Sequence, residues 1–237
     1  MIVQQALFGY DRGHRLLAHS LPRGFDDVLG ACDRRSDLSG YLPGSLVRDW
    51  TSYVRGWPVG EWYAFARTYH NRSAPRLGTC WSHVLLVPIA EWAELADPGA
   101  IAWAHRNPDD GFDEQSYASP LDVEPRDVAP VQPDDTLFDV HYIGGQRGQR
   151  TLLQIAHSSL VRREPFVLVA ATDLGCADEG ETLVRRVWPT LPGRVRTEAS
   201  FNTLALGSSL ASLSVCPPSS VGDVLYGNAA TVVKHRG

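Results

Sequence analysis

The sequence lacks three features that would place it in a broad functional class. No run of apolar residues reaches the roughly 18 that a membrane-spanning helix needs, and the start of the chain has neither the basic residues nor the unbroken apolar stretch of a signal peptide. The net charge of -5 gives no general attraction to nucleic-acid backbones or anionic lipids. We therefore expect a cytoplasmic protein that binds neither nucleic acid nor membranes.

Closely spaced cysteines are also missing. The chain has four cysteines, each tens of residues from the next, which fits neither a paired zinc motif nor a small disulfide framework. The candidate metal ligands likewise lack the short pair spacing that pre-orders zinc ligands: His14, His19, Cys32, His70, Cys80 and His83. We expect reduced, mostly buried thiols, no metal site and no cofactor.

The composition that is present is typical of a globular protein. Hydrophobic residues make up 43% of the 237 residues and charged residues 21%. A stretch rich in proline and acidic residues, 107–136, reads as a linker or long loop. The sequence therefore predicts an N-terminal α+β domain over 1–106 and a smaller mixed α/β domain over 137–237.

The predicted N-terminal domain contains an antiparallel sheet with short helices. Strands are expected over 2–8 and 14–20, joined by a tight turn at 10–13 in which Gly13 supplies the backbone freedom. A short helix is expected over 22–33, and aromatic-rich strands over 60–70 and 78–88. In the last of these strands, even-numbered and odd-numbered residues should lie on opposite faces, and both faces are apolar enough to be covered.

The predicted C-terminal domain alternates helices and strands. Helical spacing of apolar residues indicates helices over 151–161 and 181–188, and the apolar run at 165–171 indicates a buried strand between them. Short strands are expected in the segments SFNTLAL, SLSVCP and ATVVKHR. The chain shows no internal repeat and no heptad pattern.

The segment LFGYDRGHRLLAHS, residues 7–20, is the first candidate site. His14 could act as an acid or base and Arg15 could bind an anion, since imidazole titrates near neutrality and guanidinium pairs with carboxylates and phosphates. Strand alternation, however, places the two side chains on opposite faces. The structural alternative is that His14 bonds to backbone at the turn while Arg15 pairs with an acid such as Asp37.

Other catalytic patterns are absent from the sequence. Gly9 and Gly13 are too close for a phosphate-binding loop, and the lysine and hydroxyl residue that should follow are missing. No Gly-x-Ser-x-Gly elbow occurs, and the His-Ser-Ser at 157–159 sits in a predicted helix, where adjacent side chains point apart. We predict no catalytic residues.

Most of the seven tryptophans are expected in the core. Trp50 and Trp57 are the exceptions. They lie in loop-like sequence and are candidates for exposed anchors of an interaction surface.

Three segments of the chain resemble a bacterial family, the GTPase-associated protein one family. The resemblance rests on QALFGYDRGHRLLAHS (5–20), SDLSG (36–40) and, in the second half, VWPTLPGRVRTEASFNTLALG (187–207). The last stretch resembles the family's middle domain, and the family's long C-terminal part has no counterpart here. The resemblance implies a multi-domain protein encoded near GTPases, acting as an adaptor or regulator in a predicted antiviral or immune module, with no established catalytic residues.

Two functional hypotheses follow. In the first, the protein is a non-enzymatic adaptor that binds a GTPase or another protein of the same system. Its docking surface would be drawn from the hairpin and the nearby loop: Tyr10, Asp11, Arg12, His14, Arg15 and Asp37. In the second, it is an enzyme or a nucleotide or small-molecule sensor whose pocket gathers Tyr10, His14, Arg15 and Asp37 with a histidine of the aromatic strands. In a further form of the adaptor hypothesis, the protein regulates GTP hydrolysis by supplying an arginine, and Arg12 in the turn is the candidate.

Overall fold

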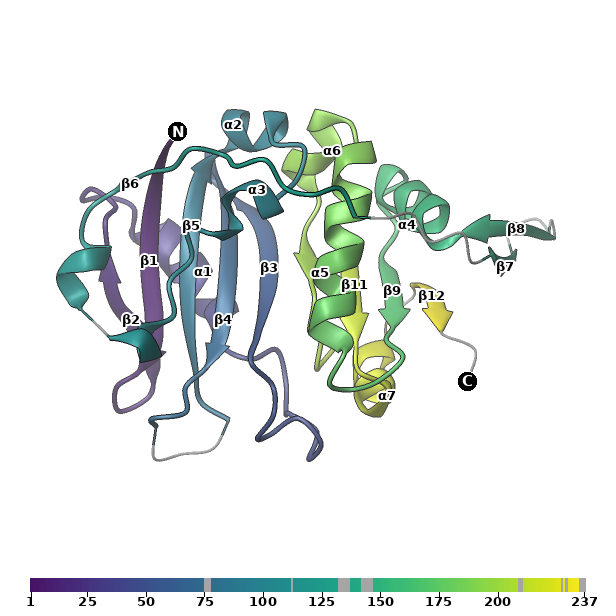
Figure 1. Ribbon diagram of the computed structural model, residues 1–237, viewed down its shortest axis with the longest axis horizontal. Helices are drawn as coiled ribbons and strands as arrows, with labels where there is room; N and C mark the ends of the chain where they lie inside the picture. The colour runs from purple at the N-terminus through teal and green to yellow at the C-terminus, as the bar shows by residue number, and fades with distance from the viewer. Residues whose placement is uncertain are drawn as a thin grey trace.

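The computed structural model describes residues 1–74, 78–111, 113–131, 137–141, 147–208, 211–226, 228 and 230–234. These residues form a 10-stranded mixed sheet that runs through both halves of the chain, with helices on its two faces (Figure 1). The strand order along the sheet is β12-β9-β11-β10-β3-β4-β5-β1-β2, and β6 (Leu121–Asp122) pairs with β1 off this path. A separate two-stranded ribbon consists of β7 (Leu137–His141) and β8 (Arg147–Thr151).

The N-terminal half of the sheet is antiparallel. Each of its strands pairs with its neighbour in reverse direction: β1 (Ile2–Tyr10), β2 (His14–His19), β3 (Ser52–Val59), β4 (Trp62–His70) and β5 (Cys80–Pro88). The predicted hairpin is confirmed, because Tyr10 pairs with His14 across the turn. The strand β3 was not predicted.

The C-terminal half of the sheet is parallel. Its strands are β9 (Phe166–Val169), β10 (Phe201–Asn202), β11 (Leu213–Cys216) and β12 (Thr231–Lys234). The short strand β10 joins the two halves, since it runs antiparallel to β3 on one side and parallel to β11 on the other. The α+β fold, with an antiparallel sheet followed by a smaller mixed α/β part, is therefore confirmed.

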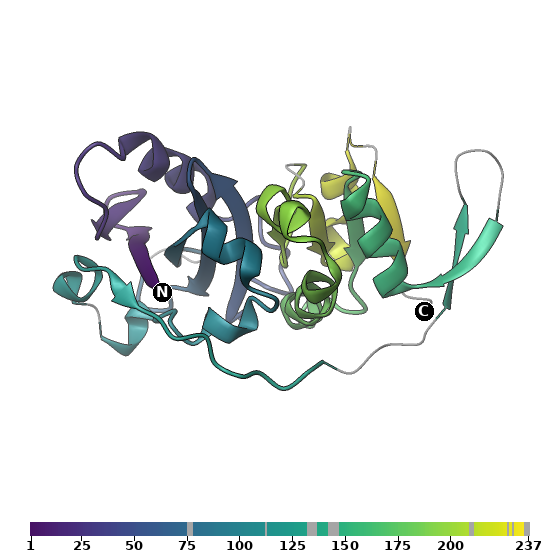
Figure 2. The same cartoon turned by 90° about the horizontal axis from the view of Figure 1, so that it is seen from above.

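Helices cover both faces of the sheet. Seven α-helices lie in the described residues: α1 (Asp26–Ser36), α2 (Ile89–Glu94), α3 (Gly99–Ala102), α4 (Leu152–Val161), α5 (Cys176–Val187), α6 (Gly193–Glu198) and α7 (Val221–Leu225). The described residues also contain short 3-10 helices, labelled η1 (Pro108–Asp110), η2 (Glu114–Tyr117), η3 (Trp188–Thr190) and η4 (Pro218–Ser220). Figure 2 shows α1 on one face and the extended segment 121–131 along the other.

Alternation along the strands explains which helix covers which face. In β4, Tyr63 and Phe65 point into the main core, which α2, α3, α4 and α5 complete, while Ala64 and Ala66 point to the opposite face. Those alanines are small, so α1 packs closely over them through Leu29 and other apolar residues. The same alternation in β5 confirms that both of its faces are covered.

An aromatic cluster connects the two halves. Tyr63 stacks on Trp92 with ring centroids 4.0 Å apart and planes inclined by 8°. Trp92 meets Trp188 edge-on at 6.0 Å, and Trp188 in turn meets Phe201 of β10 at 5.1 Å. All four rings are almost completely buried, and the Tyr63 hydroxyl donates to the carbonyl of Ala199 at 2.8 Å. The core is therefore continuous across the change from antiparallel to parallel pairing.

Two predictions about tryptophan exposure are wrong. Trp57 lies within β3 and is only 3% exposed, and Trp50 is 5% exposed and stacks on His70 with centroids 5.1 Å apart. Trp57 is buried because β3 pairs with β4 along its whole length and is held as a central strand. Trp50 precedes β3 and is buried because its ring packs against Tyr53 and His70.

The remaining local predictions agree with the structure to within a few residues. The helix predicted over 22–33 begins and ends later, and those at 151–161 and 181–188 correspond to α4 and α5. Parts of the predicted linker, 112 and 132–136, lie outside the described residues, and the domain boundaries remain a prediction. No helix in the described ranges is long and apolar enough to cross a membrane.

Candidate functional site

The turn of the β1–β2 hairpin is the first element of the candidate site. Arg12 has a φ of 59° and Gly13 a φ of 145°, both in the region that few residues other than glycine adopt readily. The backbone amide of Asp11 donates to the carbonyl of Gly13 at 3.0 Å, which closes the turn. Asp11 and Arg12 are exposed at its tip.

His14 fixes the base of this hairpin to α1. One ring nitrogen, Nε2, lies 2.7 Å from the hydroxyl of Ser36, the last residue of α1. The Ser36 hydroxyl donates to the carbonyl of Asp33 at 2.9 Å. Because that hydroxyl hydrogen is already used, His14 Nε2 is assigned as the donor to Ser36. The hairpin and the helix end are thus held together through side chains.

Asp37 and Cys80 lie beside His14. Cys80 begins β5, and its Sγ is 3.6 Å from Oδ1 of Asp37 and 3.9 Å from the carbonyl of Ser36. The same Oδ1 accepts from the backbone amide of Leu38 at 2.8 Å. Ligand-type atoms of His14, Asp37 and Cys80 all lie within 4.8 Å of one another.

These residues line a cavity of about 320 Å³, which we call the hairpin cavity. It opens between the hairpin, the loop after α1 and the start of β5. The described residues that line it are Tyr10, Gly13, His14, Asp37, Leu38, Gly40, Tyr41, Leu42, Val47, Gly78, Thr79 and Cys80. Tyr41, at its edge, is 97% exposed.

Half of the predicted site residues meet in this cavity. Tyr10, His14 and Asp37 line it, whereas Asp11, Arg12 and Arg15 do not. The predicted ion pair between Arg15 and an acid is found, but the acid is Asp11 and not the suggested Asp37, because alternation turns Arg15 to the outer face of the hairpin, away from the cavity.

The predicted partner of His14 is also wrong, since His14 bonds to the side chain of Ser36 and not to backbone. The histidines of the aromatic strands lie elsewhere: His70 stacks on Trp50, and Nε2 of His83 lies 3.0 Å from Oε1 of Gln5.

Burial sets the protonation of the cavity residues. Burial lowers the pKa of His14, against the opposing charges of Asp37 and Asp33, so its imidazole is mainly neutral near pH 7. Burial, and next the charge of Asp37, raises the pKa of the Cys80 thiol. The thiol is therefore protonated at neutral pH, which is the opposite of what a nucleophilic cysteine requires.

A second cavity, of about 270 Å³, lies on the other side of the loop 37–38. Arg34, Arg35, Arg55 and Trp57 are among its lining residues. Arg55 is only 6% exposed and donates to the carbonyls of Arg35 and Asp37, the latter at 2.5 Å. This buried arginine holds the chain that follows α1 and so positions Asp37.

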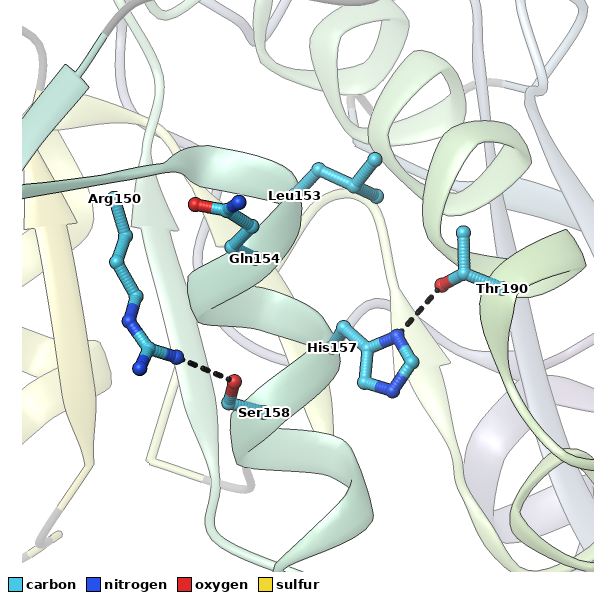
Figure 3. A pocket seen from close by; sticks show the side chains of 6 residues that line it. All are labelled: Arg150, Leu153, Gln154, His157, Ser158 and Thr190. Atoms are coloured by element: carbon cyan, nitrogen blue, oxygen red, sulfur yellow. Dashed lines mark hydrogen bonds between the residues drawn. The ribbon is translucent and has the colours of Figure 1, made fainter.

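A third, shallow cavity of about 610 Å³ lies on α4 in the C-terminal half (Figure 3). His157 points toward Thr190, with Nδ1 3.0 Å from the hydroxyl, while Ser158 accepts from Arg150 at 3.3 Å. His157 and Ser158 therefore point apart, as the helical spacing predicts, and do not form a catalytic pair.

Comparison with known proteins identifies the part of the chain that contains the hairpin cavity. Residues 2–104 match the family model described as GTPase-associated protein 1, N-terminal domain type 1. These residues form a GAP1-N1 domain. No curated protein and no solved structure matches the chain. The predicted family is therefore confirmed over these residues.

The GAP1-N1 domain contains every residue of the His14, Asp37 and Cys80 cluster. The sequence named His14 and Cys80 among possible metal ligands and Asp37 in the Ser-Asp-Leu element, but it did not predict that the three side chains meet. The missing information is the strand register: β1 pairs with β5 so that Phe8 lies opposite Ser82, and with β2 so that Tyr10 lies opposite His14. These pairings bring the start of β5 to the hairpin, and α1, which packs across the sheet, ends beside it at Asp37.

Proposed function

We propose that this chain is a non-enzymatic adaptor or regulator of a bacterial GTPase-linked defence system, and that it binds a GTPase or another protein of that system. The GAP1-N1 match supports an association with a GTPase. The observation that carries the proposal is the tip of the β1–β2 hairpin, where Asp11, Arg12 and Arg15 are exposed on a turn held firmly from below.

The tip has the properties of a docking element. It protrudes at the edge of the sheet, since β2 is the last strand in the order. The Asp11–Arg15 pair is half-exposed, with side chains 47% and 58% accessible, so it contributes little to stability and remains available to a partner. Arg12 adds a further positive charge on the same turn.

The test is a calorimetric titration of the protein with the neighbouring GTPase in its GTP and GDP forms. The variant Arg12→Asn removes the charge with a residue that tolerates positive φ. Arg163→Asn is the matched control, because Arg163 is also exposed and has a φ of 60°, but lies in the C-terminal half. We expect wild type and Arg163→Asn to bind and Arg12→Asn to bind at least about tenfold more weakly, as for a hot-spot residue.

Equal binding by Arg12→Asn would overturn the hairpin tip as the docking element. Failure of the folded wild type to bind any neighbouring gene product would overturn the adaptor function. Measuring GTP hydrolysis in the same mixtures tests whether Arg12 acts on the reaction, in which case the variant lowers the rate more than it lowers binding.

The hairpin cavity supports a second candidate function, an enzyme or a nucleotide or small-molecule sensor. Its volume of about 320 Å³ is within the range of small-ligand sites, and Tyr10, His14 and Asp37 offer polar groups at its wall. A thermal-shift screen of nucleotides and metabolites with wild type and His14→Gln tests this candidate. Stabilisation of wild type alone would support it, and the absence of any shift would count against it.

A further inference from the structure

Three different metal-ligating side chains converge in the GAP1-N1 domain. His14 comes from the start of β2, Asp37 from the residue after α1, and Cys80 from the start of β5. Their ligand-type atoms lie within 4.8 Å of one another, although the residues are far apart in sequence. Nitrogen, oxygen and sulfur are the ligands that zinc takes from histidine, aspartate and cysteine.

The separation of the sulfur and oxygen atoms fits a shared ion. The Cys80 thiol donates a hydrogen bond to Asp37 Oδ1, with the sulfur and oxygen atoms 3.6 Å apart. In a tetrahedral zinc site with bonds of about 2.3 Å to sulfur and about 2.0 Å to oxygen, these two ligands lie roughly 3.5 Å apart. An ion could therefore sit between them without a large movement of either side chain.

The hydrogen bond between His14 and Ser36 suits the imidazole to act as a metal ligand. Because Nε2–H donates to Ser36, the other ring nitrogen carries the free lone pair, and a hydrogen bond of this kind is what orients metal-binding histidines in general.

The Asp37 carboxylate takes part in none of the ion pairs found among the described residues. The nearby Arg55 donates to the backbone carbonyl of Asp37 and so fixes the loop while leaving the carboxylate to other partners. Asp37 is exposed and faces the open side of the cavity, whereas Cys80 is 1% exposed at its floor.

A catalytic cysteine is the competing explanation of the cluster. It is disfavoured because Cys80 is only 1% exposed and lies 3.6 Å from a carboxylate oxygen, and both features favour the neutral thiol over the thiolate that a nucleophile requires. A divalent cation reverses this balance, since it binds the thiolate directly and offsets the two negative charges.

We propose that His14, Asp37 and Cys80 bind one divalent transition-metal ion, with Zn²⁺ the best match to this set of ligands. Three protein ligands leave a fourth position open to the hairpin cavity, which has room for a water molecule or an exogenous ligand. When the ion binds at neutral pH, the Cys80 S–H bond breaks, the sulfur donates its electron pair to the metal, and the proton passes to buffer. This site shares the cavity with the second candidate function and rests on neither proposed function.

The test is titration of the metal-stripped full chain with Zn²⁺ by calorimetry, and with Co²⁺ by absorption spectroscopy. We expect one equivalent per chain, a heat that depends on the buffer because one proton is released, and thiolate-to-cobalt charge-transfer absorption with tetrahedral ligand-field bands. Cys80→Ser should abolish the charge-transfer absorption, and Asp37→Asn and His14→Gln should each weaken binding at least about tenfold.

Cys216→Ser is the matched control, since Cys216 is also a buried free thiol but lies in β11 of the parallel half. It should bind metal as wild type does. Asp37→Asn is expected to fold, because the exposed asparagine keeps an oxygen that can accept a hydrogen bond from the Leu38 amide. Circular dichroism and thermal unfolding of each variant establish that it is folded.

Two results would overturn the proposal. One is the absence of stoichiometric zinc binding by the folded wild type. The other is binding by folded Asp37→Asn, together with folded Cys80→Ser, within twofold of wild type, which would place the ion elsewhere. Neither outcome depends on the GTPase, so the site can fail while the adaptor function stands.

Discussion

The antiparallel and parallel halves of the sheet bury different kinds of side chains. In the N-terminal half, the buried polar residues include amides, histidines and an arginine: Gln5, Ser36, Arg55, Thr68, His70, Asn71, Ser82, His83 and His105. In the C-terminal half they are hydroxyl residues and one asparagine: Ser159, Asn202, Thr203, Ser214 and Ser220. Among the residues whose burial is described, the buried histidines and the buried arginine thus all lie in the half that contains the GAP1-N1 domain.

Strand pairing explains this difference. The parallel strands β9 and β11 have helices on both faces, α4 and α5 on one and α7 on the other, so their side chains meet apolar surfaces. The antiparallel strands are covered by loops and turns as well as by helices, and the backbone groups of these loops satisfy buried polar side chains. Gln5, for example, donates to the carbonyls of Ser116 and Ser119 at 3.0 and 2.6 Å. The antiparallel end of the sheet, which packs partly against loops, can therefore hold a chemical site. The parallel end, which has helices on both faces, serves as a scaffold.

The largest expected effect concerns the aromatic cluster that joins the halves. Trp188→Ala removes a fully buried ring that contacts Trp92 and Phe201. We expect the free energy of unfolding to fall by about 3–5 kcal/mol in one cooperative transition, measured by urea denaturation. Trp103→Ala, at a ring that is 41% exposed, should cost far less. Separate unfolding transitions for the two halves would show that they are independent units and would contradict the continuous core.

The second expected effect is a pH dependence that arises in the N-terminal half. Nδ1 of His83 accepts from the backbone amide of Arg106 at 3.1 Å, and Nε2 donates to Gln5 at 3.0 Å, so the neutral ring satisfies both partners. Burial, with His105 and Arg106 nearby, holds the pKa of His83 well below 6.5.

Because the unfolded chain takes up a proton at His83 near pH 6.5 and the folded chain does not, stability is full above that pH and falls below it. From pH 7 to pH 5 we expect a loss of about 2 kcal/mol from His83 alone. Denaturation of wild type and His83→Leu across this range measures it. If the variant shows the same pH slope as wild type, His83 is not the source.

The smallest expected effect tests how closely the loops of the two halves approach. A Cβ added at Gly40 would lie 2.5 Å from the backbone oxygen of Leu206, so this glycine allows the loop after α1 to pack on the C-terminal half. Gly40→Ala should lower the free energy of unfolding by about 1–3 kcal/mol.

Gly44→Ala is the matched control, because a Cβ there meets nothing within 4 Å. Its expected effect on thermal or urea unfolding is within about 0.5 kcal/mol. Equal effects of the two substitutions would mean that the contact between Gly40 and Leu206 does not constrain the two halves.

Local pattern predicted most of the elements. The hairpin, both aromatic strands, α4, β9 and α5 follow from alternation, helical spacing and turn residues, all of which act between near neighbours. The strand β3 was missed because Gly56 and Pro58 interrupt a short apolar run, and pairing with β4 outweighs these local signals. Trp57 was misplaced for the same reason. Trp50, which precedes β3, was misplaced because its burial depends on contacts with Tyr53 and His70.

The candidate site was predicted only in part. His14 and Asp37 could be named because they lie in the hairpin and in the element after α1. The error over Arg15 shows the limit of such reasoning, since several acids were available and the choice between Asp11 and Asp37 depends on which face of the strand each side chain occupies.

Residue order and local backbone preference were enough to predict the α+β class and the β1–β2 hairpin, and short motifs were enough to predict the family that residues 2–104 match. That His14, Asp37 and Cys80 meet could be seen only in the folded chain. Their meeting requires the registers of β1 with β2 and β5, the packing of α1 on the small alanines of β4, and the buried hydrogen bonds of Arg55. These are long-range contacts, and their free energy depends on surfaces that come together only when the whole sheet has formed.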